Sequence, residues 1–231
     1  MSIAKKLKRK KTLAVRKKNN VDRNKLLKLN FLGEKIAEKN LPRIEKYCHA
    51  YWLPMFCCVM RKSFGFGFDR MNKMNDGIVH IFDVLREPRF LKLEWLEEGF
   101  ELECNGFKLE RQDRLKQPES FTLEGFSEMY AYNASLTTSE NLEIVWLWVL
   151  HDSFGFGKDR LMKATTALAK LQKMPEKVFN FILEDLEKVK AKGKSLNFQW
   201  VRDTMKELSV DGYTFDDGLV LLRELLFPLW K

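Results

Sequence analysis

The residues best suited to chemistry form a short pattern that occurs twice. Ser63-Phe-Gly-Phe-Gly67 returns as Ser153-Phe-Gly-Phe-Gly157, and an arginine follows three residues after each copy. Two glycines one residue apart allow positive φ and close approach to the backbone. Where the second glycine opens a helix, free N–H groups can hold an anion, most commonly a backbone phosphate. The pattern therefore predicts phosphate contacts from Gly65, Gly67, Arg70, Gly155, Gly157, Lys158 and Arg160.

The same pattern has a purely structural interpretation. A Gly-x-Gly segment can make a tight turn between packed helices while the two Phe rings fill the core. The glycines would then be needed for steric reasons, and the arginines would be exposed or paired with Asp69 and Asp159. A third interpretation assigns the turns to contact with another protein. The sequence leaves all three open.

The two turns resemble the helix-hairpin-helix family, whose members bind the DNA backbone without sequence preference. The resemblance rests on Phe64-Gly65-Phe66-Gly67 and Phe154-Gly155-Phe156-Gly157, which match a hydrophobic-Gly-hydrophobic-Gly hairpin. It implies that the hairpin amides contact phosphate, supported by nearby basic residues. Lys158 has no counterpart in the first copy, where Phe68 stands, so the second hairpin is the stronger candidate.

A second basic feature lies at the start of the chain. The net charge of the 231-residue chain is +9, but residues 1–28 alone carry +11, so the remainder is nearly neutral at −2. We predict a flexible basic arm over residues 1–22 that orders only on a partner, with nucleic acid as the natural polyanion. An acidic protein, an anionic membrane or simple solubilisation are the alternatives. Its basic residues are Lys5, Lys6, Lys8, Arg9, Lys10, Lys11, Arg16, Lys17 and Lys18.

Other chemistry has weak support. Cys48, Cys57 and Cys58 lie near His49 in sequence, but their spacing fits no zinc pattern, and buried thiols explain them better. No phosphate-binding Walker loop, His-Glu-x-x-His or Gly-x-Ser-x-Gly motif occurs. We therefore expect no catalytic residues, no metal and no cofactor. A nuclease with a site assembled from distant residues stays open.

The hydrophobic pattern predicts a mainly α, compact protein with a pseudo-duplicated helix-turn-helix-like unit and one small β-hairpin. Each copy, about 42–85 and 138–173, consists of an all-apolar helix, the glycine turn and an amphipathic helix. Together with the segments that follow, these copies make a helical body over residues 23–231.

Turn and cap signals refine this prediction. Pro42 opens one helix, and Pro54 kinks it or opens another. The alternating segment 98–111 around Asn105-Gly106 forms the β-hairpin. A helix begins near Thr122 and ends near Ser135, after which Thr137-x-x-Glu140 caps the second copy. The C-terminal helices, within 175–231, span 175–192, 196–208 (capped by Ser195) and a last one from Thr214.

These observations favour a non-catalytic, sequence-independent nucleic-acid-binding accessory protein that grips the DNA or RNA backbone. Phe-Gly-Phe-Gly-Lys-x-Arg-Leu also resembles segments of uncharacterised phage and mobile-element proteins of low-GC Gram-positive bacteria. A protein-interaction module, such as an inhibitor of a host nucleic-acid enzyme, is the alternative. The charged start, unlike a secretory signal, and the lack of a Cys-x-x-Cys pair indicate the cytoplasm, and no membrane contact is expected. The sequence does not indicate the oligomeric state.

Overall fold

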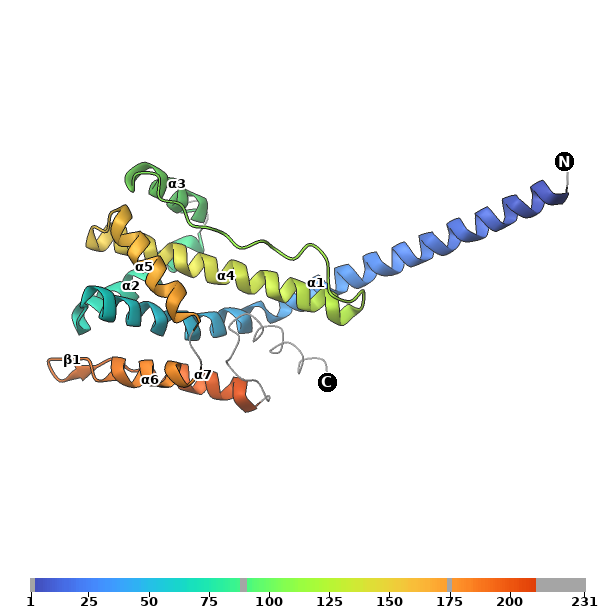
Figure 1. Ribbon diagram of the computed structural model, residues 1–231. Helices are drawn as coiled ribbons and strands as arrows, with labels where there is room; N and C mark the ends of the chain where they lie inside the picture. The colour runs from blue at the N-terminus through green and yellow to red at the C-terminus, as the bar shows by residue number, and fades with distance from the viewer. Residues whose placement is uncertain (1–2, 88–90, 174–175, 211–231) are drawn as a thin grey trace.

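A computed structural model describes residues 3–87, 91–173 and 176–210, and it confirms the mainly α fold. Figure 1 shows two long helices, α1 and α4, lying side by side, with shorter helices around one end of the pair. The helices of the described residues are α1 (Ile3–Phe64), α2 (Phe68–Leu85), α3 (Leu93–Glu103), α4 (Leu123–Phe154), α5 (Lys158–Leu171), α6 (Glu176–Glu187) and α7 (Gln199–Val210).

Helix α1 runs unbroken through both of its prolines. At 62 residues it is about 93 Å long. Pro42 and Pro54 lie inside it, so the prediction that Pro42 opens a helix is wrong, and of the two alternatives for Pro54 the start of another helix is wrong as well. Each proline removes a backbone hydrogen bond, yet the segment from Ile44 to Met60 keeps its apolar face on α4. This burial outweighs the local preference of proline for a helix start.

The basic N-terminal segment is a helical extension of α1. The backbone of residues 3–22 is helical, which corrects the prediction of an arm without regular structure over residues 1–22. Lys, Arg, Leu and Ala are strong helix formers, and the sequence before Leu26 contains no glycine or proline that would end the helix. Figure 1 shows this extension projecting away from the other helices.

Helix α4 is a single element where the sequence predicts two. The helix begins at the predicted place, and the Thr122 side chain caps it by accepting a hydrogen bond from the Gly125 amide at 3.1 Å. The predicted cap of the second copy is wrong, because Thr137 lies in mid-helix and its hydroxyl donates to the Asn133 carbonyl. Glu140 instead forms an ion pair with Arg114 at 2.6 Å.

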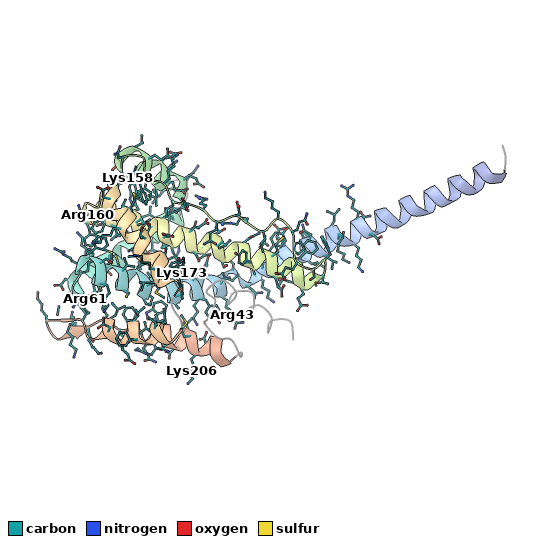
Figure 2. All side chains as sticks on the ribbon, viewed as in Figure 1. Arg43, Arg61, Lys158, Arg160, Lys173 and Lys206 are labelled. Atoms are coloured by element: carbon teal, nitrogen blue, oxygen red, sulfur yellow. The ribbon has the colours of Figure 1, made fainter. Side chains whose placement is uncertain are left out.

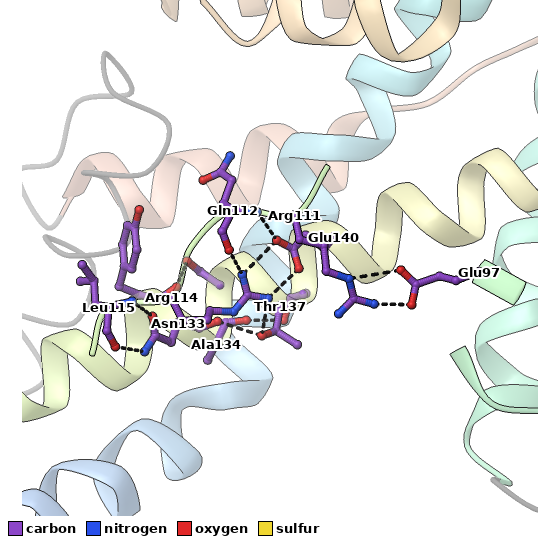
Figure 3. Close-up of polar contacts among 12 residues, drawn as sticks. Glu97, Arg111, Gln112, Arg114, Leu115, Asn133, Ala134, Thr137 and Glu140 are labelled. Atoms are coloured by element: carbon purple, nitrogen blue, oxygen red, sulfur yellow. Dashed lines mark hydrogen bonds and ion pairs between the residues drawn. The ribbon is translucent and has the colours of Figure 1, made fainter. Parts of the chain in front are cut away.

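The segment between α3 and α4 is held along the side of α4 by polar contacts (Figure 3). Arg114 reaches both Thr137 and Glu140, and the Leu115 backbone exchanges two hydrogen bonds with the Asn133 side chain, at 2.9 and 3.0 Å. Arg111 pairs with Glu97 and so joins this segment to α3. Thr137 and Glu140 thus hold a connecting segment in place.

The predicted β-hairpin at 98–111 is wrong. Its first part is the end of α3, and its turn residues, Asn105 and Gly106, have φ of 53° and 71° and close the C-terminus of that helix. The Gly106 amide donates to the Glu101 carbonyl at 3.0 Å. Positive φ serves a helix end as well as a hairpin, and the buried side chains of Leu96 and Phe100 follow the helical period.

A small β-hairpin does exist, but it lies near the C-terminus. Strands β1 (Lys190–Ala191) and β2 (Lys194–Ser195) pair antiparallel around Lys192-Gly193, both with positive φ. The predicted helix 175–192 therefore ends early, at Glu187. Asn197, not Ser195, accepts from the Gln199 amide where α7 begins. The helix predicted from Thr214 lies outside the described residues.

The two copies of the repeat exchange partners. Helix α2 packs chiefly on α4, and α5 packs chiefly on α1, so each amphipathic helix covers the apolar helix of the other copy. The predicted apolar faces of α2 and α5 are the ones that lie in this interface, where Met71, Met74, Leu161 and Ala164 are fully buried. The core is therefore shared between the copies. This shared core brings the two glycine turns to the same end of the bundle.

Candidate nucleic-acid interface

The two glycine turns have nearly the same backbone conformation. Gly65 and Gly155 end α1 and α4 with φ of 65° and 63°, a left-handed conformation that favours glycine. The Phe66 and Phe156 amides then donate to the Met60 and Leu150 carbonyls, each at 3.1 Å. These bonds lock each turn against the helix before it. The predicted duplication is thus confirmed in three dimensions.

An approximate two-fold axis relates the turns. Phe64 contacts Phe156 and Phe66 contacts Phe154, in both cases with ring centroids 4.9 Å apart. Deeper in the bundle Phe56 stacks on its own equivalent, Trp146, with centroids 4.4 Å apart and planes 4° apart. Such reciprocal contacts are the signature of an isologous interface. The two turns therefore form one continuous surface.

Sequence reasoning missed the pair of lysines that ties the turns together. Lys73 of α2 donates to the Ser153 carbonyl at 3.4 Å, and Lys163 of α5 donates to the Ser63 carbonyl at 3.2 Å. Each ammonium also lies over a Phe ring of the opposite turn, at 5.3 and 5.1 Å from its centroid. Extending the 90-residue offset beyond the arginines would have found both lysines.

The glycines face outward while the phenylalanine rings face inward. Gly65, Gly155 and Gly157 are exposed, Gly67 is half-buried, and a Cβ added to any of them would meet no atom within 4 Å. Phe66 and Phe156 are buried. Gly67 and Gly157 begin α2 and α5 in extended conformation with no side-chain cap. The rings thus fill the core, and the first-turn amides remain free of capping side chains.

Basic side chains surround this end of the molecule, as the labelled Arg61, Lys158 and Arg160 show in Figure 2. Arg70 and Arg160 lie over the Phe66 and Phe156 rings, at 5.6 and 4.7 Å from the centroids. Arg160 also donates to the Gly155 carbonyl at 2.5 Å. The guanidinium groups thus stay beside the turns, bound to them through backbone and ring contacts.

The extra lysine of the second copy contacts another element. Lys158 donates to the Asn105 carbonyl at 3.1 Å and so links the second turn to the end of α3. Asp69 and Asp159 lie exposed in the first turns of α2 and α5, where they favour the helix dipole but oppose an incoming anion. The basic side chains outnumber these acids.

The predicted basic residues of the arm lie far from the turns. Lys18 and Phe64 are on the same helix, and 46 residues at 1.5 Å each separate them by roughly 70 Å. The arm and the glycine turns therefore cannot contact the same phosphate. They form two separate candidate surfaces, at opposite ends of α1 (Figure 1).

A histidine braces the second turn. His151 Nδ1 lies 3.0 Å from the Phe156 carbonyl oxygen and Nε2 lies 3.1 Å from a Glu103 carboxylate oxygen. In the first copy its equivalent, Arg61, donates to the Phe66 carbonyl at 3.2 Å. Burial lowers the pKa of His151, but the hydrogen bonds to Glu103 and Phe156 outweigh it and raise this pKa above its ordinary value.

The thiol of Cys104 lies 3.3 Å from His151 Nδ1, which completes a Cys-His-Glu arrangement that the sequence does not indicate. Burial, and then the charge of Glu103, raise the pKa of Cys104, which disfavours the thiolate needed for nucleophilic attack. All four cysteines are buried and unpaired, which confirms the prediction of buried thiols for Cys48, Cys57 and Cys58. The arrangement therefore has the chemistry of a structural brace.

Protonation of His151 should stabilise the protein in a defined pH range. Because its folded-state pKa is raised, its contribution is complete below the unfolded value near 6.5 and is lost as pH rises through the folded value. We expect His151→Arg, which copies Arg61, to remove this loss between pH 6.5 and 8.5. His151→Ala should cost about 1 kcal/mol at pH 6 and less at pH 8.5.

Urea denaturation of both variants and the wild type over this pH series measures the effect. His80→Arg, on the exposed face of α2, is the matched control, since its pH dependence should follow the wild type. If the unfolding free energy of His151→Arg depends on pH as that of the wild type does, His151 does not stabilise the second turn through its protonated form.

Among residues 3–87, 91–173 and 176–210, no cluster of three or more His, Cys, Asp or Glu side chains is arranged to hold a metal ion. Within the same residues, no helix is both long and apolar enough to cross a bilayer.

No family model, no curated protein and no solved structure matches this chain.

Proposed function

We propose that this protein binds the sugar–phosphate backbone of nucleic acid, without sequence preference and without catalysing a reaction. The observation that carries the proposal is the pair of outward-facing glycine turns joined at one end of the bundle. Their open glycines, at Gly65 and Gly155, let a phosphate approach, and the uncapped amides of α2 and α5 can donate to it. The resemblance of the two glycine turns to helix-hairpin-helix turns supports the same proposal.

The arrangement of charge supports backbone contact over base reading. Arg70 and Lys73 of α2 and Arg160 and Lys163 of α5 all lie beside the turns, and each already contacts a ring or a carbonyl of a turn. Held in this way, they lose little further conformational freedom when a phosphate arrives. The two-fold relation of the turns lets two phosphates be bound at once. The distant arm adds long-range, salt-dependent attraction of its own.

A double variant of the second turn tests the proposal. Gly157 has φ of −85° and open space around it, so the Gly157→Val chain should fold. The valine side chain blocks the approach of a phosphate to the second turn, and Arg160→Glu replaces a positive charge beside that turn with a negative one. We expect affinity for random duplex and single-stranded DNA and RNA at low salt to fall roughly 10-fold. The slope of log affinity against log salt should flatten by about one.

Two comparisons make the test specific. Lys173→Glu, just past the far end of α5 (Figure 2), should have a smaller effect, and a chain beginning at residue 23 should keep the binding that the double variant removes. If the shortened chain binds nothing at low salt while its melting temperature is unchanged, the turns do not bind and the arm alone does. Cleavage of labelled nucleic acid with Mg²⁺ or Mn²⁺ would favour a nuclease.

A protein-interaction role is the second candidate, and a separate surface favours it. On α1, Leu27 and Phe31 are more than half exposed, at 58% and 56%, and Leu26 and Leu32 adjoin them. An exposed apolar stripe of this kind commonly marks a protein contact. Substituting Leu27 and Phe31 with Gln should leave nucleic-acid binding unchanged if the proposed function is right.

A further inference from the structure

An open groove lies beside the first glycine turn, between the end of α1 and α5. Its volume is about 450 Å³, within the roughly 300–1,000 Å³ usual for small-molecule sites. Val59 and Cys58 of α1 and Met162, Ala167 and Leu171 of α5 make its apolar floor. The groove is thus largely apolar, yet it opens at the end of the molecule that carries the turns.

The two copies differ at the position of Cys58, one of the residues that line the groove. The equivalent of Cys58 on α4 is Trp148, whose indole is half-buried. Its six-membered ring packs so closely on α3 that a Cβ on Gly99 would lie 2.5 Å from it, and its centroid lies 5.4 Å from that of Phe100. One copy therefore has a planar aromatic ring, packed on α3, at the position where the other has a thiol that lines the groove.

Three lysines surround the groove, at Lys62, Lys163 and Lys170. Lys163 is held by the Ser63 carbonyl, and Lys62 pairs with Asp185 of α6 at 2.8 Å. No carboxylate lines the groove among the described residues. The equivalents of Lys62 and Lys170 in the other copy are Asp152 and His80, and only Lys163 has a lysine as its equivalent, so the full basic rim belongs to one copy. An apolar floor with a basic rim fits a flat ring attached to anionic groups.

We propose that this groove receives one unpaired base of single-stranded nucleic acid, with the neighbouring phosphates held by the three lysines. The inference rests on the proposed function and adds a preference for unpaired strands. Ser63 lies both in the groove wall and at the start of the first turn, so the groove adjoins the turn and a strand that contacts the turn can continue over it. The apolar floor accepts any base, since ring stacking and burial do not depend on base identity.

The test compares two single strands that have equal phosphate charge, with a duplex as a reference. Binding of the full chain is measured for oligothymidylate, for a strand of the same length made of abasic sites, and for a duplex. Because the arm and turns contact phosphates alike in the two single strands, the preference for oligothymidylate over the abasic strand reports the groove. We expect this preference to be roughly 5- to 50-fold, as for a stacked base elsewhere.

Filling the groove should remove the preference. Cys58→Trp copies Trp148 of the other copy, and Thr166→Trp fills the groove from an exposed position on α5, where misfolding is less of a risk. We expect either variant with a wild-type melting temperature to bind the two strands equally and to keep its affinity for duplex. Val79→Trp, at an exposed position of α2 away from the groove, is the matched control and should keep the full preference.

Each alternative outcome has a distinct meaning. Equal binding of both strands by the wild type overturns the groove proposal but leaves the proposed function intact. Persistence of the preference in a well-folded Thr166→Trp chain also overturns it. Failure of the wild type to bind any strand or duplex overturns the proposed function itself. Tight binding of an acidic amphipathic peptide that Thr166→Trp abolishes, with no strand preference, would assign the groove to a protein partner and overturn the proposal.

Discussion

Replacing Trp146 with alanine should lower the free energy of unfolding by about 3–5 kcal/mol, the usual cost of deleting a large buried aromatic side chain. The indole is fully buried and stacks on Phe56 at the axis between the copies. Its removal leaves a cavity bordered by both α1 and α4, where neither long helix can move without breaking other contacts. Urea denaturation followed by far-UV circular dichroism measures the loss.

Two variants isolate the stacking contribution. Trp146→Phe keeps a ring on Phe56 and removes an indole N–H that is buried without a hydrogen-bond partner among the described residues, so it should cost less than about 1.5 kcal/mol. Trp200→Ala removes an indole that is 41% exposed and should cost less than about 1.5 kcal/mol. A cost near 1 kcal/mol for Trp146→Ala would mean that the axis contributes little to stability.

The second large effect concerns a carboxyl group on α4. Burial, and then the charge of Glu140, raise the pKa of Glu143 from 4.5 to about 7. Since the folded-state pKa exceeds the unfolded value, the folded protein holds this proton more tightly. Its stability should therefore fall as pH rises from about 4.5 to 7 and stay low above that range. Glu143→Gln should abolish this fall and raise stability by roughly 2–3 kcal/mol at pH 8.

The pH range separates this effect from that of His151, whose contribution is lost only above pH 6.5. Unfolding free energies at pH 5, 6, 7 and 8 for the wild type and Glu143→Gln should converge at pH 5 and diverge above it. Glu124→Gln, at an exposed position in the first turn of α4, serves as the control and should follow the wild type. Parallel curves for Glu143→Gln and the wild type would show that the Glu143 carboxyl is ordinary in the folded protein.

The parts of the fold that the sequence predicts are those that repeat. Two copies of one pattern constrain each other, so the glycine turns, the apolar helices before them and the buried faces of α2 and α5 are all predicted correctly. Elements that depend on single local signals fare worse. Asn105-Gly106 needs positive φ in a hairpin and at a helix end alike, and only the packing of Leu96 and Phe100 decides between the two. Pro42 and Pro54 are likewise local signals for a helix start, yet the packing of α1 on α4 keeps both inside one helix.

Within the candidate site, the sequence indicates the glycines and arginines but not the contacts that hold them. Lys73 and Lys163 make their contacts across the two-fold axis, to Ser153 and Ser63. Arg61 and His151 brace the turns through unlike chemical groups, so comparison of residue types alone does not reveal their equivalence. These roles arise from the way the copies face each other, which no single copy specifies. The groove beside Cys58 is lined by residues of α1 and α5, two helices whose packing no local sequence signal indicates.

The exchange of amphipathic helices between the copies has a bearing on ancestry. A polypeptide with only one unit, α1 and α2, would leave α2 without α4 to cover and the apolar end of α1 without α5. Such a chain could bury these faces only by associating with an identical chain as a homodimer. Duplication and fusion of a gene for that homodimer would place both halves in one polypeptide. One half could then acquire Trp148 while the other kept a small side chain, a divergence that two identical subunits cannot achieve.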